Sequence, residues 1–202
     1  MRNSTRPSGS TEKSREVYEL IVIGTSWGGL DAVSRLLDGL HEHVRQPIVV
    51  AQHRSPNHGD GMLPSLLALH TRRVVSDPDD KTPLEDDHVY IGPPDYHVLV
   101  ENGHLALSTE APVNHSRPSI DVLFESAADA YGHRAVGIVL TGANQDGAAG
   151  LALLKDRGGV AIVQDPGTAE RRAMPDAAIA ATKADAVLPL EEIPPFLYGL
   201  CA

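Results

Sequence analysis

The sequence predicts a doubly wound α/β fold, in which a mostly parallel β-sheet carries helices on both faces and a small antiparallel hairpin is inserted. Two observations favour this fold. Short apolar runs alternate with longer segments in which apolar residues recur every three or four positions, and such alternation is typical of parallel sheets. The dipeptide Asn102-Gly103 separates two apolar-bearing runs, which predicts a hairpin with a type I′ turn.

The first half of the chain supplies strands, two helices and the hairpin. The apolar run 17–23 ends at Gly24, and 48–51 and 88–91 are similar short runs, so each predicts a strand. Segments 30–40 and 62–69 have helical apolar spacing. Residues 71–87 are polar, acidic and interrupted by prolines, so a loop is expected there. The hairpin strands are 97–100 and the LALS run after Gly103.

The second half continues the alternation without an internal repeat. Helices are predicted at 119–131, which Gly132 ends, at 148–157, which Gly158-Gly159 ends, at 175–182 and at 191–200. Strands are predicted at 135–140, 160–164 and 186–189. Residues 1–16 are polar and rich in serine, which predicts a disordered tail before one folded domain at 17–202.

Composition excludes several classes of protein. The 202 residues carry a formal net charge of −10 and only 4% aromatic residues, whereas nucleic acids and anionic membranes require a basic face. No apolar run has the length of a membrane span, so direct insertion into a membrane is not expected. No signal peptide is visible, so a cytoplasmic protein is expected. A single cysteine, Cys201, excludes an internal disulfide and a Cys-rich zinc site. No metal or organic cofactor is expected.

A glycine-rich turn follows the first predicted strand. Gly24-Thr25-Ser26-Trp27-Gly28 matches the G-x-S-x-G pattern of a nucleophile elbow, which lies between a strand and a helix. Ser26 would then stand at the carboxyl edge of the sheet, where ligands bind in such folds. Two other interpretations are open: Ser26 could cap the following helix, or the turn could cradle a phosphate, although its spacing fits neither common phosphate motif.

Two further residues could activate Ser26. His53 follows the second buried strand, at the same predicted edge, and a serine hydroxyl requires a base to become nucleophilic. Asp146 follows the strand 135–140 in a glycine-rich loop and could orient the imidazole, or it could cap the helix that begins near residue 148. Asp121 and Asp165 are rival acids, and Asp121 lies in the first turn of a helix, where an acid is expected in any case.

At these residues the chain resembles the catalytic domain of the CheB-type chemotaxis protein-glutamate methylesterases. The resemblance extends from about residue 17 to 197. The matching blocks, in the family's order, are VIGTSWGG at 22–29, VVAQHRSP at 49–56, HVYIGPPDYHVLV at 88–100, NHSRPSIDVLFESAA at 114–128, GIVLTGANQDGAAGL at 137–151, VAIVQDP at 160–166 and AMPDAAI at 173–179.

The resemblance implies a role for each site residue. By position, Ser26 is the nucleophile, His53 the general base and Asp146 the orienting acid, while backbone amides of Trp27 and Ala143 stabilise the oxyanion. Two residues depart from the family pattern. Trp27 stands where a small or hydroxylated residue is usual, and Ala143 stands where methionine is common, which affects the expected substrate more than the chemistry.

The resemblance also implies an activity and partners. The family hydrolyses glutamate methyl esters on the cytoplasmic helices of chemoreceptors, releasing methanol, and some members deamidate receptor glutamines. Most members begin with a receiver domain, and only 16 residues precede the predicted domain here, so a regulatory receiver would be a separate protein. A non-catalytic binding module of the same fold and a hydrolase of another ester or amide are the alternatives. Five arginines could guide an acidic receptor surface: Arg54, Arg72, Arg73, Arg171 and Arg172.

Overall fold

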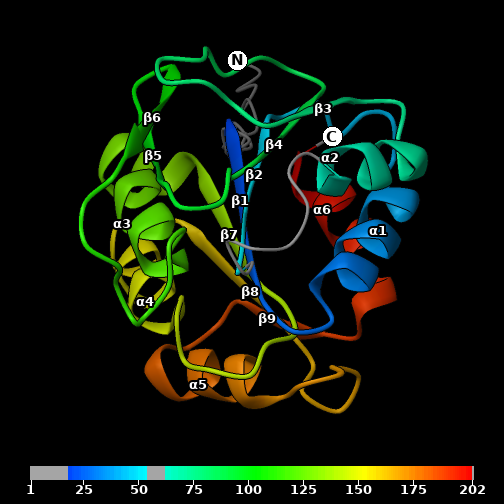
Figure 1. The fold of residues 1–202 in the computed structure, drawn as a ribbon. Coiled ribbons are helices and arrows are strands. Elements are labelled where there is room, and N and C mark those ends of the chain that lie inside the picture. The colour runs from blue at the N-terminus through cyan, green and yellow to red at the C-terminus, as the bar shows by residue number, and fades with distance from the viewer. Residues whose placement is uncertain (1–17, 54–61, 202) are drawn as a thin grey trace, which may run out of the picture.

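A parallel seven-stranded sheet forms the centre of the protein in a computed structural model that describes residues 18–53 and 62–201 (Figure 1). Along the sheet the order is β3-β4-β2-β1-β7-β8-β9. The strands are β1 Leu20–Thr25, β2 Ile48–Gln52, β3 Val74–Ser76, β4 His88–Ile91, β7 Ala135–Val139, β8 Val160–Gln164 and β9 Ala186–Leu188. The predicted tail at 1–16 lies outside the described residues.

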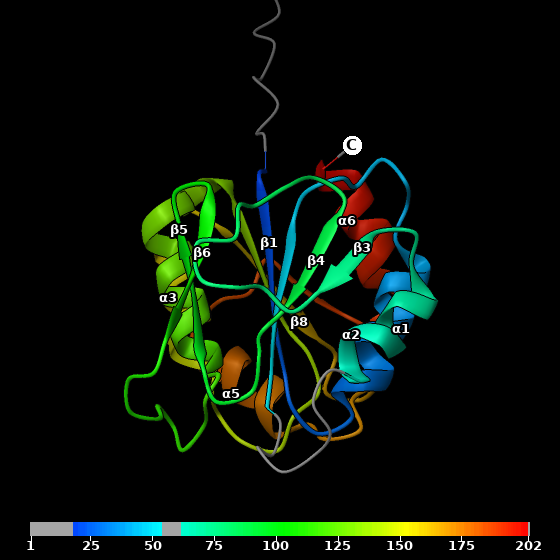
Figure 2. The ribbon, with the colours of Figure 1, turned by 45° about the horizontal axis from the view of Figure 1, so that its top comes forward.

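Helices cover both faces of this sheet. One face carries α1 (Gly29–Gly39), α2 (Met62–Leu67) and α6 (Ile193–Cys201), and the other carries α3 (Ile120–Tyr131), α4 (Ala148–Asp156) and α5 (Ala173–Ala181). Figure 2 shows the sheet enclosed between these two helical layers. The predicted doubly wound α/β fold is therefore confirmed.

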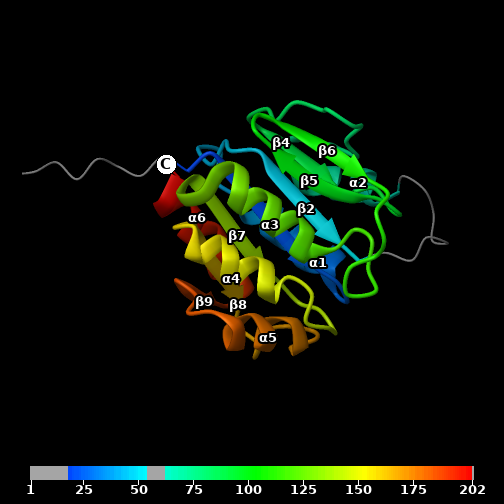
Figure 3. The ribbon, with the colours of Figure 1, turned by 90° about the vertical axis from the view of Figure 1, so that its left-hand side faces the viewer.

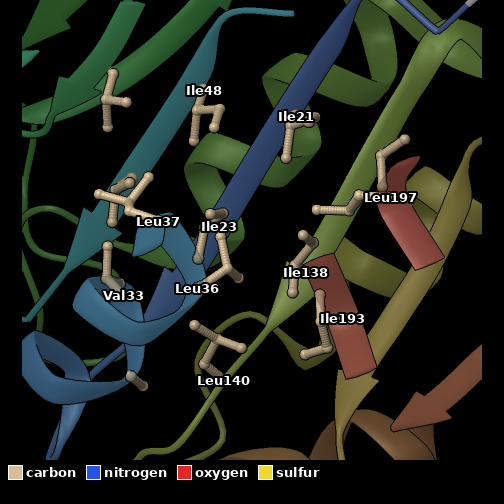
Figure 4. Close-up of a cluster of buried hydrophobic side chains, with 14 of the residues drawn as sticks. Ile21, Ile23, Val33, Leu36, Leu37, Ile48, Ile138, Leu140, Ile193 and Leu197 are labelled. Atoms are coloured by element: carbon tan, nitrogen blue, oxygen red, sulfur yellow. The ribbon is translucent and has the colours of Figure 1, made fainter. Parts of the chain in front are cut away.

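Two apolar clusters hold the layers together, because successive side chains of a strand point to opposite faces of the sheet. Ile21 and Ile23 of β1 pack with Leu36 of α1 and Ile193 of α6 in the first cluster (Figure 4). Leu20 and Val22 of the same strand belong to the second cluster, with α3 and α4. Strands buried on both faces explain why the sheet segments read as continuous apolar runs.

The predicted hairpin forms apart from the main sheet. Strands β5 (His97–Glu101) and β6 (His104–Ser108) pair antiparallel beside α3 (Figure 3). Its turn differs from the predicted type I′, because only Gly103 has a positive φ, of 84°. A positive φ at the second central residue alone is the pattern of a type II turn.

The expected loop at 71–87 contains a strand, which corrects the sequence-based prediction. Val74–Ser76 forms β3 and pairs in parallel with β4 at the edge of the sheet. An edge strand has one partner and needs no apolar run, and Val74 is 54% exposed. Among the described residues, no helix has the length and apolar character needed to cross a membrane.

Gly24, the last β1 residue paired with β7, allows α3 to approach the sheet closely. A Cβ atom at this position would lie 2.1 Å from Cγ2 of Ile120, the first residue of α3. We therefore expect Gly24→Ala to lower the free energy of unfolding by roughly 1–3 kcal/mol through overpacking, as measured by urea denaturation.

Gly199→Ala is the matched control, because nothing lies within 4 Å of the added Cβ and Gly199 lies in α6. Alanine favours a helix over glycine, so this variant should be as stable as the wild type or slightly more stable. Equal destabilisation by the two substitutions would contradict the close approach of α3.

Candidate active site

The candidate site lies where the connections of the sheet diverge. The chain leaves β1 toward β2 and leaves β7 toward β8, on opposite sides, and ligands bind beyond the carboxyl ends of strands at such a switch point. Thr25 of β1 is in register with Gln52 of β2, so Ser26 and His53 follow two paired residues. Asp146 lies in the loop after β7, the other neighbour of β1.

Backbone hydrogen bonds hold the turn around Ser26 in place. Its N–H donates to the carbonyl of Thr141 at 3.0 Å, and its own carbonyl accepts the N–H of Gly29 at 3.0 Å. Gly28, with φ of 79°, is the N-cap residue of α1, and no side chain caps that helix. The interpretation of Ser26 as a helix cap is therefore wrong. Within the described part of the chain, its half-buried hydroxyl makes no hydrogen bond.

His53 uses both ring nitrogens. Nε2 lies 2.7 Å from Oδ2 of Asp146, and Nδ1 lies 3.3 Å from Nδ2 of Asn144. The Oδ1 atom of Asn144 accepts the backbone N–H of Asp146, so its amide nitrogen faces the imidazole. A carboxylate only accepts hydrogen bonds, so the neutral ring carries its proton on Nε2. Nδ1 is then the nitrogen with the lone pair, which accepts the N–H of Asn144.

Asp146 is a fully buried carboxylate that accepts hydrogen bonds from several directions. Besides His53, its donors are Nδ2 of Asn114 at 2.9 Å, Oγ of Ser119 at 2.8 Å and the backbone N–H of Ile120 at 2.7 Å. Burial pushes its pKa upward, but the bonds from His53, Asn114, Ile120 and Ser119 outweigh burial and lower the pKa to about 2. The group is therefore an anion at every physiological pH.

Asp121 lies in α3 and Asp146 lies just before α4, and each carboxylate accepts hydrogen bonds from the start of the other helix. Asp146 accepts the backbone N–H groups of Ile120 and Asp121, at the start of α3. Asp121 accepts those of Gly147 and Gly150, at the start of α4, at 2.9 and 2.7 Å. The alternative that Asp146 caps its own helix is wrong, since it caps the neighbouring one. Burial, together with the charge of Asp146, raises the pKa of Asp121.

Neither rival acid is bonded to His53 in the described structure. The side chain of Asp121 is occupied by α4 and by Nδ2 of Asn114, which also donates to Asp146. Asp165 lies in the turn after β8, where its Oδ1 accepts the N–H of Gly167 at 2.8 Å. Of the three acids considered from the sequence, Asp146 alone joins the imidazole.

Three residues around this cluster were not identified from the sequence. Asn114 and Ser119 bind the carboxylate of Asp146, and Asn144 contacts the imidazole of His53. Ser119 precedes a helix, which indicates a helix cap, yet its hydroxyl donates to Asp146 and makes no cap bond. Asn144 is two residues from Asp146, so proximity to the predicted acid was the one available signal.

The two predicted oxyanion donors border a shallow hollow of about 480 Å³, lined by Trp27, Ala143, Arg171, Arg172 and Ala173. The backbone N–H groups of Trp27 and Ala143 donate to no other group in the part of the chain that the structure describes. They are therefore available to an oxygen atom placed beside Ser26. A second hollow, of about 560 Å³, lies between Asn114, Asn144 and Ala177.

The five arginines considered as guides for a substrate separate into two sets. Arg171 and Arg172 border the hollow beside Trp27. Arg72 and Arg73 precede β3, at the amino edge of the sheet, and Nη1 of Arg73 donates to the carbonyl of Gln46 before β2. These two arginines lie on the opposite edge from the site, which corrects that prediction. Arg54 lies outside the described residues.

The chemistry of this arrangement is that of an activated hydroxyl. A serine with a free hydroxyl, an imidazole held by a buried carboxylate and two unused backbone donors are the components of acyl transfer. Among the residues with described positions, no three His, Cys, Asp or Glu side chains gather in a way that could hold a metal ion.

The low pKa of Asp146 makes stability depend on pH. Its folded pKa of about 2 lies below the ordinary value of 3.8, so the unfolded chain binds a proton first on acidification. This contribution is complete above about pH 4, is lost between about pH 4 and 2, and amounts to about 2 kcal/mol. Asp146→Asn should therefore destabilise the protein more at pH 6 than at pH 3, as measured by denaturant midpoints.

The control for this measurement is Asp129→Asn, which changes an exposed carboxylate paired with Arg157. We expect it to have a small effect at both pH values. A destabilisation by Asp146→Asn that is identical at pH 6 and pH 3 would show that its hydrogen bonds do not favour the charged form.

Known proteins match most of this chain. The CheB methylesterase family matches residues 21–197. A putative protein-glutamate methylesterase/protein-glutamine glutaminase of Leptospira interrogans is 44% identical over 177 residues, covering 87% of this chain and 91% of that protein. Protein-glutamate methylesterase/protein-glutamine glutaminase 2 of Anaeromyxobacter dehalogenans is 40% identical over 182 residues, covering 90% of this chain and 53% of that protein.

A solved structure agrees with the sequence matches. The crystal structure of the Thermotoga maritima CheB methylesterase catalytic domain superposes with a TM-score of 0.85 at 31% identity, covering 91% of this chain and 98% of that one. The resemblance seen in the sequence is thereby confirmed over both the chain and the fold. The protein belongs to the CheB methylesterase family.

Proposed function

We propose that this protein is a serine hydrolase that removes methyl groups from glutamate methyl esters of proteins and releases methanol. The observation that carries the proposal is the 2.7 Å contact between Nε2 of His53 and Oδ2 of Asp146. His53 and Ser26 each follow one of the paired residues Gln52 and Thr25, at the ends of two neighbouring strands. Its membership of the CheB methylesterase family supports the same reaction. The proposed substrates are methylated chemoreceptor helices in the cytoplasm.

The proposed reaction has two steps. In the first, Nδ1 of His53 takes the proton of Ser26 as the hydroxyl oxygen attacks the ester carbonyl, and the bond to the methoxy group then breaks. Methanol leaves with the proton from His53, and the glutamyl group remains on Ser26. In the second step water, deprotonated by His53, attacks this acyl-enzyme, which yields the glutamate carboxylate and restores the serine.

Asp146 and the backbone amides stabilise the charges of this reaction. The carboxylate keeps the proton of the neutral ring on Nε2 and stabilises the imidazolium that forms when Nδ1 is protonated. The N–H groups of Trp27 and Ala143 would donate to the oxyanion of the tetrahedral intermediate. A glutamine side chain could follow the same path with ammonia as the leaving group, in keeping with relatives named glutaminases.

Ser26→Ala should lower the rate of methanol release from a methylated receptor fragment by at least about a thousandfold, because the nucleophile is lost. The wild type should also be labelled at Ser26 by a serine-directed phosphonate, which distinguishes an enzyme from a binding module of the same fold. Ser108→Ala, on strand β6, is the control, because the hydroxyl of Ser108 accepts the N–H of Glu110 at 3.1 Å. Ester hydrolysis by Ser26→Ala close to the wild-type rate would refute the mechanism.

The same mechanism predicts a loss of activity when the base is removed. His53→Ala takes away the imidazole, whereas Asp146, with a pKa of about 2, stays an anion. We expect kcat for a small neutral ester to fall by at least about a thousandfold. His43→Ala, which changes an exposed histidine, is the control, and turnover by His53→Ala at the wild-type rate would exclude His53 as the base.

A comparison of substrates tests the alternative that the protein is a hydrolase of another ester or amide. Methanol release from methylated receptor should exceed hydrolysis of an unrelated ester of similar reactivity by a large factor in kcat/KM. Similar values for both would assign the site to a different substrate while leaving the roles of Ser26 and His53 intact.

A further inference from the structure

The side chain of Trp27 is held at its edge and its face by two consecutive residues. Its indole Nε1–H donates to Oε1 of Glu170 at 2.7 Å, and the guanidinium carbon of Arg171 lies 5.3 Å from the centroid of the ring. Trp27 is nevertheless 58% exposed. An exposed indole that directly follows the proposed nucleophile is thus fixed by the loop between β8 and α5.

Glu170 also contacts the elbow itself. A Cβ atom built on Gly28 would lie 2.6 Å from Oε2 of Glu170, so this oxygen packs against the α-carbon of Gly28. The two oxygens of one carboxylate therefore bridge Trp27 and Gly28, the two residues after Ser26. Glu170 can approach the turn this closely because position 28 is glycine and has no Cβ atom.

The side chain of Thr141 joins the same two segments, the turn after Ser26 and the loop between β8 and α5. Its Oγ1 donates to the carbonyl of Trp27 at 2.9 Å and accepts the backbone N–H of Arg171 at 2.9 Å. Trp27 is thus held at its carbonyl and at its ring, which together fix the position of its α-carbon. Its N–H is the polar group without a partner in the described structure, and it is the predicted oxyanion donor.

The bond between Glu170 and Trp27 contributes little to folding. Both residues are exposed, and hydrogen bonds between exposed side chains contribute little to stability. The apolar clusters on the two faces of the sheet hold the fold. Orientation is a different matter, because misaligned donors lose most of their effect on a developing oxyanion.

We infer that Glu170 is a positioning residue for ester hydrolysis, which acts through the indole of Trp27 to aim the backbone N–H of Trp27 at the oxyanion. This inference rests on the proposed function. Among the described residues, Glu170 makes no hydrogen bond to Ser26, His53 or Asp146, and its contacts are with Trp27 and Gly28. Its effect should appear in kcat for every ester, including the smallest, and much less in KM.

Three variants test the inference with the full chain. Glu170→Ala removes the acceptor and should lower kcat for a small neutral ester roughly tenfold. Glu170→Gln keeps an oxygen acceptor for the indole and should retain most of the activity. Trp27→Phe keeps the ring without the N–H donor and should match Glu170→Ala, and the double variant should be no slower than either single variant.

Glu101→Ala is the matched control, because it removes another exposed carboxylate that pairs with a distant side chain, Lys81 at 3.0 Å. It lies on β5, away from the site, and should leave kcat unchanged. Thermal unfolding of Glu170→Ala should stay within a few degrees of the wild type. A loss of activity that follows a comparable loss of stability would indicate a structural role and overturn the inference.

Fluorescence reports on the proposed link directly, because Trp27 is the one tryptophan in the chain. Quenching of its emission by acrylamide should increase in Glu170→Ala and stay at the wild-type level in Glu170→Gln and Glu101→Ala. A lower kcat without a change in quenching would mean that Glu170 does not act through Trp27, and this too would overturn the inference.

The two proposals can fail separately. If Ser26→Ala hydrolyses the ester as well as the wild type, the proposed function is wrong. If hydrolysis depends on Ser26 but Glu170→Ala has the wild-type kcat, or if the effects of Glu170→Ala and Trp27→Phe multiply in the double variant, the role of Glu170 alone is refuted.

Discussion

The site depends on the hydrogen bonds that stabilise a buried negative charge on Asp146. An isolated carboxylate in the interior would be neutralised by a proton, because burial disfavours the charged form. Here the donors of His53, Asn114, Ser119 and Ile120 reverse that tendency and lower the pKa to about 2. The same bonds fix the direction of both oxygens, so the imidazole has one place to bind. The anion is therefore stabilised and oriented by the same set of contacts.

The site is assembled from short loops that follow parallel strands, and each loop is bonded to another. The backbone of Ser26 is bonded to Thr141, and the hydroxyl of Thr141 contacts both Trp27 and Arg171. Consequently the loop after β7 holds the proposed nucleophile and Trp27, and His53 is tied to the same region because its backbone N–H donates to the carbonyl of Thr25 at 3.1 Å. These loops rest on a sheet buried on its two faces, which provides the rigidity that catalytic geometry requires.

Sequence patterns predicted the parts of this structure that depend on local chemistry. Apolar runs identified six of the seven sheet strands, and the glycine-rich turn placed Ser26 correctly after β1. The pattern missed β3, because an edge strand with an exposed Val74 needs no apolar run. One alternative drawn from the pattern, that Asp146 caps the helix after it, named the wrong helix. Spacing along the chain indicates which helix start is near in sequence, whereas the start of α3, 26 residues earlier, becomes a neighbour only after packing.

The exchange of acids between α3 and α4 has a consequence for the order of events during folding. Asp146 acquires its position by binding the start of α3, and Asp121 acquires its own by binding the start of α4. Neither acid is oriented while the two helices are apart, so a partly folded or nascent chain that already contains Ser26 and His53 lacks an organised acid. The acid proposed to orient His53 is therefore organised only where α3 and α4 lie side by side.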